Sequence, residues 1–456
     1  MSKENLKIII KEFHETGLPP LVERQHSIDF SLFQSRPKKI ITITGPRRAG
    51  KTYLLFQIMQ GLLANGMDIT DIIYINFEDE RILPMEGKNL QYLLDAYYEL
   101  YANKERPFIF LDEIQNIDNW DKFVRRINEQ GYIVFVTGSN SRLLSREIAT
   151  ALRGRTITYE IFPFSFSEFL AARGIAFENN LLYGKKRHEI RSLYEEYFFS
   201  GGFPEVAFTS ERATKTRILQ DYFNTMFYRD MVERYKIKNT ELLRRWLNIL
   251  MTNIASLISL SKVENDFKSQ GIKVSKSSLA SFARYVEDVF FGFFVEIYSE
   301  SARKRQANPR KFYLIDQGIH NYLTLKFSEN KGRVLENMVF AALRRKGHPV
   351  FYYKTKTGYE VDFVVKENNT LNLIQVCYDL ENIETFNRER KAIILGMKEL
   401  GLKNGLILTQ NDRREEKVGK HLIKVMPVWE WLLTSFDRKK SESNIHSSSH
   451  CPCPIQ

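Results

Sequence analysis

Residues 39–59 read KIITITGPRRAGKTYLLFQIM, in which an apolar run, a glycine-bounded loop and a second apolar run follow one another directly. The first run, residues 39–44, has the pattern of a buried strand, because it is short, rich in β-branched residues and ends at a glycine. Residues 52–59 are apolar at helical spacing, which predicts a helix. This strand–loop–helix order is the context in which glycine-bounded loops bind phosphate groups.

The loop between the strand and the helix has the composition of a phosphate-binding loop, or P-loop. Its residues are Gly45, Pro46, Arg47, Arg48, Ala49, Gly50, Lys51 and Thr52. The two glycines allow the backbone to point successive N–H groups at phosphate oxygens, and the following helix adds the positive end of its dipole. We expect Lys51 to reach the β- and γ-phosphates of ATP and the Thr52 hydroxyl to bind Mg²⁺. The P-loop and the adjoining Tyr53 therefore form the predicted ATP site.

A second apolar run, residues 107–113, reads PFIFLDE and ends in two acids. Four apolar residues predict a central strand, which places the acids at the carboxyl edge of the sheet, where ligands bind. We expect Asp112 to hold Mg²⁺ together with Thr52, and Glu113 to orient and deprotonate the attacking water. Glu113 and Lys51 are thus the predicted catalytic residues, and Thr52 and Asp112 the predicted metal ligands.

Two further segments offer polar groups to the same site. Residues 132–136 predict another buried strand, which ends in Thr-Gly-Ser-Asn at 137–140. We predict that Thr137 and Asn140 contact the γ-phosphate or the water, although Gly, Ser and Asn also favour ordinary turns. Residues 153–155 read RGR, which offers an arginine to a phosphate or simply solvates the entry to the next strand.

These motifs resemble those of the AAA-type P-loop ATPases, in the branch that includes the signal-transduction ATPases with numerous domains. The resemblance rests on residues 45–52, 108–113, 137–140, 153–155 and 162–169. In relatives of that branch a Gly-x-Pro element of the helical lid packs near the adenine, and Gly202-Phe203-Pro204 matches this element. The resemblance therefore implies that Pro204 lies in the base pocket. A helix break and turn at the same residues is the alternative.

The next region predicts a helix–turn–helix, with helices at 261–271 and 276–289. The basic residues that follow predict a wing, and they are Arg303, Lys304, Arg305, Arg310 and Lys311. Helix–turn–helix domains place their second helix in the major groove of DNA. Here that helix offers Lys276, Ser277, Ser278 and Arg284. Winged helices also bind proteins, so DNA and a protein partner both stay open.

Residues 332–433 predict a helix, three strands, a helix, two strands and a helix, and this order resembles the PD-(D/E)XK nuclease fold. The motif positions are Glu336, Asp362 and Gln375. Nuclease chemistry of this kind needs acidic oxygens around Mg²⁺ and a cation beside the attacked phosphate. Gln375 replaces an acid and Cys377 replaces the lysine, which argues against cleavage unless Lys354 or Lys356 substitutes. The resemblance implies a degenerate nuclease-like domain.

Residues 24–433 as a whole resemble the large prokaryotic family of predicted ATPases with a C-terminal domain of unknown function. We predict a multidomain α/β fold with ATP and Mg²⁺ as ligands. Its parts are an AAA-type ATPase core with a parallel sheet (1–162), a helical lid (163–239), a winged helix (240–325), a small α/β domain like the restriction endonucleases (326–436) and a disordered tail (437–456).

Composition limits the class of protein further. Of 456 residues, 67 are Lys or Arg and 55 are Asp or Glu, which gives a net charge of +12. This excess of positive charge permits contact with nucleic acid, but it is distributed over a long chain. The chain has three cysteines, no signal-peptide pattern and no apolar run long enough for a bilayer, so we expect a cytoplasmic protein without membrane contact.

The leading interpretation is a slow ATPase that acts as a nucleotide-dependent switch for its C-terminal half. A nuclease gated by ATP, in defence or DNA processing, is the first alternative. A nucleotide-binding adaptor with little turnover, which recruits a protein partner, is the second. The sequence leaves the oligomeric state open.

Overall fold

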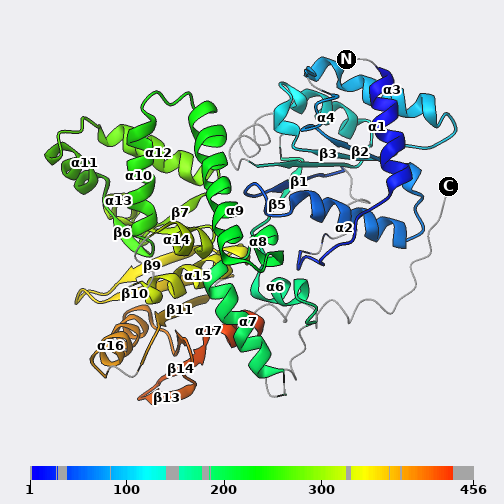
Figure 1. Ribbon diagram of the computed structural model, residues 1–456. Helices are drawn as coiled ribbons and strands as arrows, with labels where there is room; N and C mark the ends of the chain where they lie inside the picture. Colours follow the sequence, from blue (N-terminus) through cyan, green and yellow to red (C-terminus); the bar gives the residue numbers. More distant parts are fainter. Residues whose placement is uncertain are drawn as a thin grey trace.

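The computed structural model describes residues 3–26, 28, 38–82, 84–139, 154–176, 184, 186–324, 330–368, 370–380 and 383–434. Within these ranges the chain is a multidomain α/β protein, as predicted, with a parallel sheet in its N-terminal part and a separate mixed sheet in its C-terminal part (Figure 1). None of the helices in these ranges is long and apolar enough to cross a membrane. The predicted tail lies outside the described residues.

The N-terminal sheet has five parallel strands in the order β2-β3-β4-β1-β5. They are β1 (Ile40–Thr44), β2 (Ile72–Asn76), β3 (Phe108–Asp112), β4 (Val134–Gly138) and β5 (Thr156–Glu160). Strands β1 to β4 are almost continuously apolar, because helices cover both faces of the sheet. Strands β1, β3 and β4 lie within two residues of the apolar runs that predict them, which confirms the parallel-sheet core.

The helices of this part divide between the two faces of the sheet. The side chains of α1 (Lys3–Thr16), α3 (Gln91–Leu100) and α4 (Trp120–Glu129) share one apolar cluster with one face of the sheet, and α2 (Lys51–Ala64) shares another with the opposite face. Short 3₁₀ turns precede β2, α3 and α4; they are η2 (Ile69–Asp71), η3 (Gly87–Leu90) and η4 (Ile114–Asn116). Helix α2 follows β1 along the chain after a single loop, residues 45–50.

A helical region follows the sheet. It consists of α6 (Phe166–Ala172), α7 (Arg187–Ser200), α8 (Pro204–Phe208), α9 (Arg212–Thr225), the π-helix η6 (Met226–Glu233) and α10 (Thr240–Thr252). The break between α7 and α8 requires glycine, because Gly201 has a φ of 77° and a Cβ there would lie 1.8 Å from Asp316 Oδ1. The Gly202 N–H donates to Asp316 Oδ2 at 2.7 Å, which ties the break to a later segment.

A three-stranded antiparallel sheet of order β6-β8-β7 comes next, with β6 (Ser256–Ile258), β7 (Gly292–Val295) and β8 (Arg310–Leu314). Helices α11 (Leu260–Ser269) and α12 (Lys276–Asp288) confirm the two predicted helices, and α13 (Ala302–Ala307) and α14 (Gln317–Leu323) flank β8. The predicted basic wing is partly wrong: the Lys311 side chain is 3% exposed and lies in an ion-pair cluster. Strand alternation turns Lys311 inward with Tyr313, on the face opposite Arg310.

The C-terminal sheet has six strands in the order β13-β14-β12-β11-β10-β9. Its elements are α15 (Lys331–Arg345), β9 (Val350–Lys354), β10 (Glu360–Glu367), β11 (Thr370–Cys377), α16 (Ile383–Leu400), β12 (Asn404–Thr409), β13 (Arg414–Val418), β14 (His421–Pro427) and α17 (Val428–Thr434). Three strands follow α16, where the sequence predicts two. The extra strand β13 is an exposed, charged edge strand, so it lacks the apolar run on which the prediction rests.

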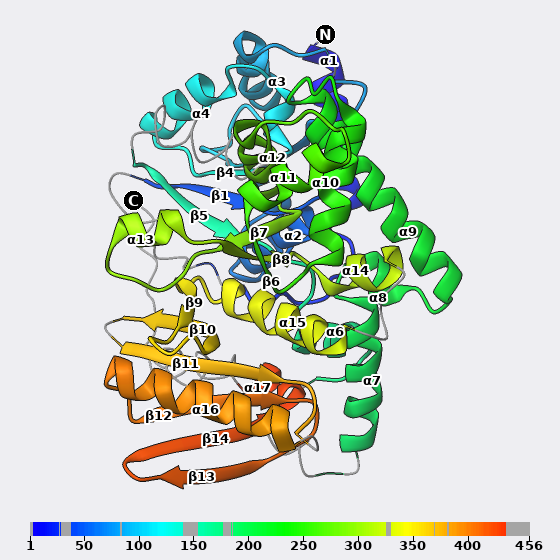
Figure 2. The ribbon, with the colours of Figure 1, turned by 90° about the vertical axis from the view of Figure 1, so that its left-hand side faces the viewer.

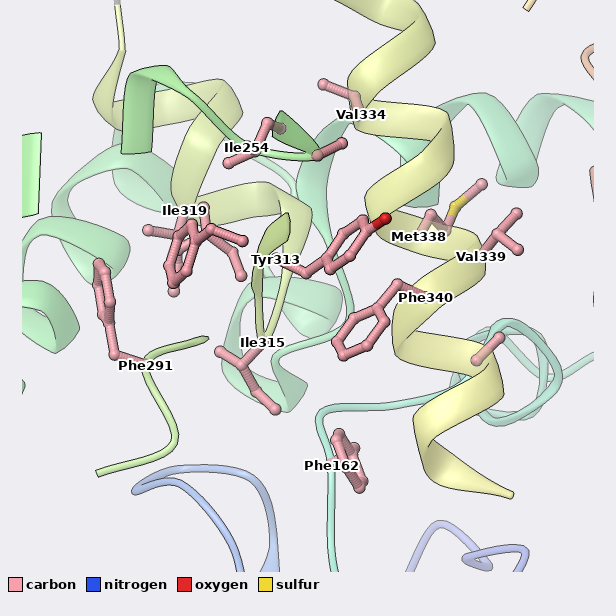
Figure 3. Close-up of a cluster of buried hydrophobic side chains, with 14 of the residues drawn as sticks. Phe162, Ile254, Phe291, Tyr313, Ile315, Ile319, Val334, Met338, Val339 and Phe340 are labelled. Carbon is pink, nitrogen blue, oxygen red and sulfur yellow. The ribbon is translucent and has the colours of Figure 1, made fainter. Parts of the chain in front are cut away.

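One apolar core connects the regions after the parallel sheet. Its buried side chains run from Phe162 to Leu433, whereas the parallel-sheet part has separate clusters of its own. Figure 3 shows the centre of this core, where Tyr313 and Phe340 lie between β8 and α15; their rings stack at 4.3 Å. Figure 2 shows α15 between the parallel sheet above and the mixed sheet below.

Candidate functional site

The predicted P-loop joins β1 to α2 and needs its two glycines for different reasons. Gly45 has a φ of 156°, and a Cβ on it would lie 2.2 Å from the Ile161 carbonyl oxygen. Gly50 caps α2 with a left-handed φ of 93°. Arg48 also has a positive φ, 63°, which is uncommon for a residue with a side chain and often marks functional loops. The loop conformation therefore depends on a glycine at each end, at Gly45 and at Gly50.

The Lys51 ammonium lies at the centre of the loop and is buried, with 4% of the residue exposed. Its Nζ is 3.1 Å from Glu113 Oε1 and donates to the Pro46 carbonyl at 3.2 Å. Burial opposes ionisation of Glu113, but the nearby Lys51 charge and a hydrogen bond from Gln115 outweigh it and hold the pKa of this carboxyl below its usual value. The two predicted catalytic residues thus form one buried ion pair.

Asp112 ends β3 and receives hydroxyl groups on both carboxylate oxygens. The Thr52 hydroxyl donates to Oδ2 at 2.7 Å and the Tyr74 hydroxyl to the same oxygen at 3.1 Å, while Thr137 donates to Oδ1. Burial raises the pKa of Asp112, against the effect of the two threonine hydroxyls. Neighbouring Thr52 and Asp112 oxygens suit Mg²⁺, which takes one or two protein oxygens and completes its shell with phosphates and water.

Thr137 links the two acids. Its hydroxyl donates to Asp112 and accepts from the Glu113 backbone N–H at 2.9 Å. Glu113 needs this support, because its φ of 52° is left-handed. Gln115 completes the arrangement by donating to Glu113 Oε2 at 2.5 Å. Neither Tyr74 nor Gln115 belongs to a sequence motif, so sequence reasoning missed both.

The two P-loop arginines face the helical region. Arg47 donates through Nε to Asp230 of η6, at 3.0 and 3.1 Å, and through Nη1 to Glu78 at 2.8 Å. Arg48 Nη1 lies 3.8 Å from Glu205 Oε2 of α8. Pro204 is the first residue of that helix, so the structure brings the predicted lid element to the tip of the P-loop.

Arg24 donates a hydrogen bond to the P-loop backbone, and nothing in its sequence context indicates this. The buried guanidinium donates through Nη1 to the Ala49 carbonyl at 2.6 Å, through Nη2 to the Phe162 carbonyl at 2.6 Å, and through Nε to Glu168 at 3.0 Å. Burial opposes ionisation of Glu168, but the charges of Arg24 and Arg345 outweigh it and keep the pKa of this carboxyl below its usual value. Arg24 therefore joins the loop to the first helix after the sheet.

The remaining predicted residues lie apart from this network or outside the described ranges. Tyr53 is 49% exposed on α2. Arg155 pairs with Glu129 at 2.7 Å, which favours its role at the strand entry. Asn140 and Arg153 lie outside the described residues.

Three family models match the chain: an AAA domain over residues 37–170, a domain of unknown function (DUF8612) over 191–331 and a second one (DUF4143) over 331–431. An uncharacterized protein of Methanocaldococcus jannaschii is 41% identical over 408 residues, which cover 87% of this chain and 89% of that protein. An uncharacterized protein of Haemophilus influenzae is 30% identical over 397 residues, which cover 86% and 94%.

Among solved structures, a chain in the structure of Drosophila ORC bound to AT-rich DNA and Cdc6 is 10% identical. The match covers 72% of this chain and 95% of that chain, with a TM-score of 0.18. A likeness of this size carries no argument about function.

Proposed function

This chain belongs to the family of the Methanocaldococcus jannaschii and Haemophilus influenzae proteins and contains an AAA domain, and on this premise we propose that it is a slow Mg-ATPase that switches its C-terminal half. One observation carries the proposal. Lys51 pairs with Glu113 at 3.1 Å, the Thr52 hydroxyl donates to Asp112 at 2.7 Å, and Thr137 links the two acids. An ammonium, a hydroxyl–carboxylate pair and a second carboxylate are the groups that ATP hydrolysis requires.

In the proposed reaction each residue changes partner in a defined way. The Lys51 ammonium turns from Glu113 to the β- and γ-phosphates, which releases the Glu113 carboxylate to accept a proton from the attacking water. Thr52 and Asp112 would hold Mg²⁺, which would neutralise negative charge on the phosphates. Thr137 keeps both acids in place. Hydrolysis is slow, on the order of 10⁻⁴ to 10⁻² per second, if no arginine from a second molecule assists.

The proposed switch uses the ion pairs of Arg47 and Arg48. They join the P-loop to η6 and α8, so a γ-phosphate that attracts either guanidinium changes the contact with the helical lid. The lid is tied to β8 and α14 through Asp316, which accepts from the Gly202 and Gly318 N–H groups. A local change at the phosphate thereby reaches the C-terminal half.

Lys51→Ala is expected to lower ATP affinity by at least about 100-fold, because it removes charge-assisted hydrogen bonds to phosphate. Titration with a fluorescent ATP analogue measures this. Lys39→Ala is the matched control, since this half-buried lysine precedes β1 and donates to the Gly154 carbonyl. Equal affinity of Lys51→Ala and the parent would place the phosphate site elsewhere.

We further propose that 240–325 is a winged helix and that 326–436 is a nuclease-like domain without cleavage activity, with the lid at 163–239. The three-stranded sheet with α11 and α12 supports the first assignment. The mixed six-stranded sheet between α15 and α16 supports the second. Cys377 cannot serve as the missing cation, because burial raises the pKa of its thiol to about 12 and keeps it neutral.

DNA is the partner that the surface of 240–325 favours. Lys276 and Arg284 of α12, and Arg303 and Lys304 of α13, are exposed. If each of the last two neutralises one phosphate, Arg303→Ala/Lys304→Ala is expected to flatten the slope of log affinity against log salt by about 1.8. Fluorescence anisotropy with duplex DNA measures the slope, and Arg245→Ala, on α10, is the control. No binding at low salt would favour a protein partner instead.

A further inference from the structure

A single ammonium lies among three carboxylates where the three-stranded sheet meets the six-stranded sheet. It belongs to Lys311, on β8. Its Nζ is 2.7 Å from Glu360 Oε1, 2.9 Å from Glu336 Oε1 and 2.9 Å from Asp362 Oδ1. Glu336 lies on α15, and the other two acids lie on β10. An ammonium has three N–H donors, so every one of them has a carboxylate oxygen to bind.

The cluster is closed from several sides. The exposed fraction is 3% for the Lys311 side chain, 11% for Glu336 and 9% for Asp362. The Tyr313 hydroxyl donates to Glu336 Oε1 at 2.6 Å, and Figure 3 shows it pointing toward α15. The Val376 N–H donates to Asp362 Oδ2 at 3.0 Å. The carboxylates are therefore oriented by groups other than the ammonium.

Gln375, the third predicted motif position, is already bound on both sides. Its Oε1 accepts from the Asp362 N–H at 3.2 Å, and its Nε2 donates to Glu389 Oε2 at 2.6 Å. Glu389 in turn accepts from Arg388 at 2.6 Å. Gln375 therefore positions Asp362 rather than offering an oxygen to a cation.

The ammonium and a divalent ion compete for the same place. A Mg²⁺ or Mn²⁺ ion binds carboxylate oxygens at about 2.1 Å and keeps several waters. An ion that bound Glu336 Oε1 and Asp362 Oδ1 would share both oxygens with Nζ, which lies only 2.9 Å from each. Two cations that share the same two carboxylate oxygens lie close together, and in a largely buried site they repel each other strongly. One of them has to leave.

We propose that this cluster is a cation site whose cation is the Lys311 ammonium, and that it admits a divalent metal ion only when this ammonium is removed. The chain thus supplies from β8 the charge that a metal would otherwise supply to α15 and β10. The junction between the two sheets is held without metal, and a phosphodiester at this place meets no Lewis acid. The site still has the oxygen ligands that hard divalent ions prefer.

The test is a metal titration of the full chain without nucleotide. The number of Mn²⁺ ions bound per chain is measured by electron paramagnetic resonance in the parent and in two variants. Lys311→Met keeps about the length of the side chain without its charge, and Lys311→Arg keeps the charge. Lys311→Met is expected to bind one more Mn²⁺ than the parent, and Lys311→Arg is expected to bind the same number as the parent. Adding Asp362→Asn to Lys311→Met should abolish the extra ion. Any Mn²⁺ held by Thr52 and Asp112 is common to all variants.

Thermal unfolding gives a second measurement. Saturating Mn²⁺ is expected to raise the Tm of Lys311→Met by about 5 °C and to leave that of Lys311→Arg unchanged relative to the parent. If Lys311→Met does not fold, Lys311→Met/Glu360→Gln replaces it, because this variant has one buried negative charge fewer and keeps Glu336 and Asp362. Either a parent protein that already binds Mn²⁺ in an Asp362-dependent manner, or folded Met variants that gain no ion, would overturn the proposal.

Discussion

Replacing Glu113 by Gln is expected to slow ATP hydrolysis by at least about 100-fold, which is the usual loss when a positioned proton acceptor is removed. ATP affinity should stay the same or rise. Lys51 Nζ is 3.1 Å from Glu113 Oε1, so the γ-phosphate has to compete with this carboxylate for the ammonium. A neutral amide removes the competition without changing the shape of the site.

Single-turnover hydrolysis and equilibrium ATP binding, measured on the same preparation, separate the two effects. Gln115→Ala is the informative comparison, because Gln115 orients Glu113 through its 2.5 Å hydrogen bond and carries no charge. It should lower the rate less than Glu113→Gln does. Hydrolysis at the parental rate by Glu113→Gln would show that another group accepts the proton.

Arg24→Met is expected to lower the free energy of unfolding by about 3 to 5 kcal/mol, the usual cost of leaving one partner of a buried ion pair uncompensated. Arg24 and Glu168 side chains are each 2% exposed, so solvent cannot replace the lost partner. Two backbone carbonyls, those of Ala49 and Phe162, lose their donors as well. Urea denaturation at pH 7 measures the change.

The pH dependence identifies the cause. In the parent the pKa of Glu168 lies below its ordinary value of 4.5, so its contribution to stability is present above pH 4.5 and is lost as the pH falls through the lower, folded-state pKa. Without Arg24 burial dominates and the pKa rises, so the variant should recover stability as the pH is lowered from 7 toward 4.5. Arg24→Met/Glu168→Gln should be more stable than Arg24→Met at pH 7. A loss that is independent of pH would point to the carbonyl contacts alone.

The parts of the site that could be predicted from the sequence are those whose signal is local. The P-loop follows β1 without interruption, and Asp112 and Glu113 end an apolar strand, so their meeting at one sheet edge follows from the parallel arrangement. Arg24 and Asp230 could not be predicted in this way. Arg47 and Asp230 are 183 residues apart, and Arg24 lies 144 residues from Glu168. Single charged residues at such distances carry no pattern that selects the partner.

Lys311 shows a different limit. Next to Arg310 and after Arg303–Arg305 it has the appearance of surface charge, and the sequence interpretation groups it with a DNA-binding wing. Its burial depends on which face of β8 packs on α15, and the Tyr313 and Phe340 stack fixes that face. The local sign is that Lys311 directly precedes four apolar residues in RKFYLI at 310–315, where it alternates with Phe312 onto the face of Tyr313. This pattern indicates a buried lysine only when the acids on α15 and β10 are known to lie opposite Lys311.

The apolar core that begins at Phe162 and ends at Leu433 also limits when the second half of the chain can fold during synthesis. Helix α6 lies against α17, and Arg187 of α7 lies over the Trp429 ring of α17, so these contacts are incomplete until nearly the whole polypeptide has left the ribosome. At about 5 to 20 residues per second, the interval between the two ends of this core is about 15 to 50 s. The parallel-sheet part has its own apolar clusters, so we expect it to fold during this interval. We expect the nascent second half, which exposes many Phe and Tyr side chains over that interval, to be the segment most prone to aggregation during synthesis.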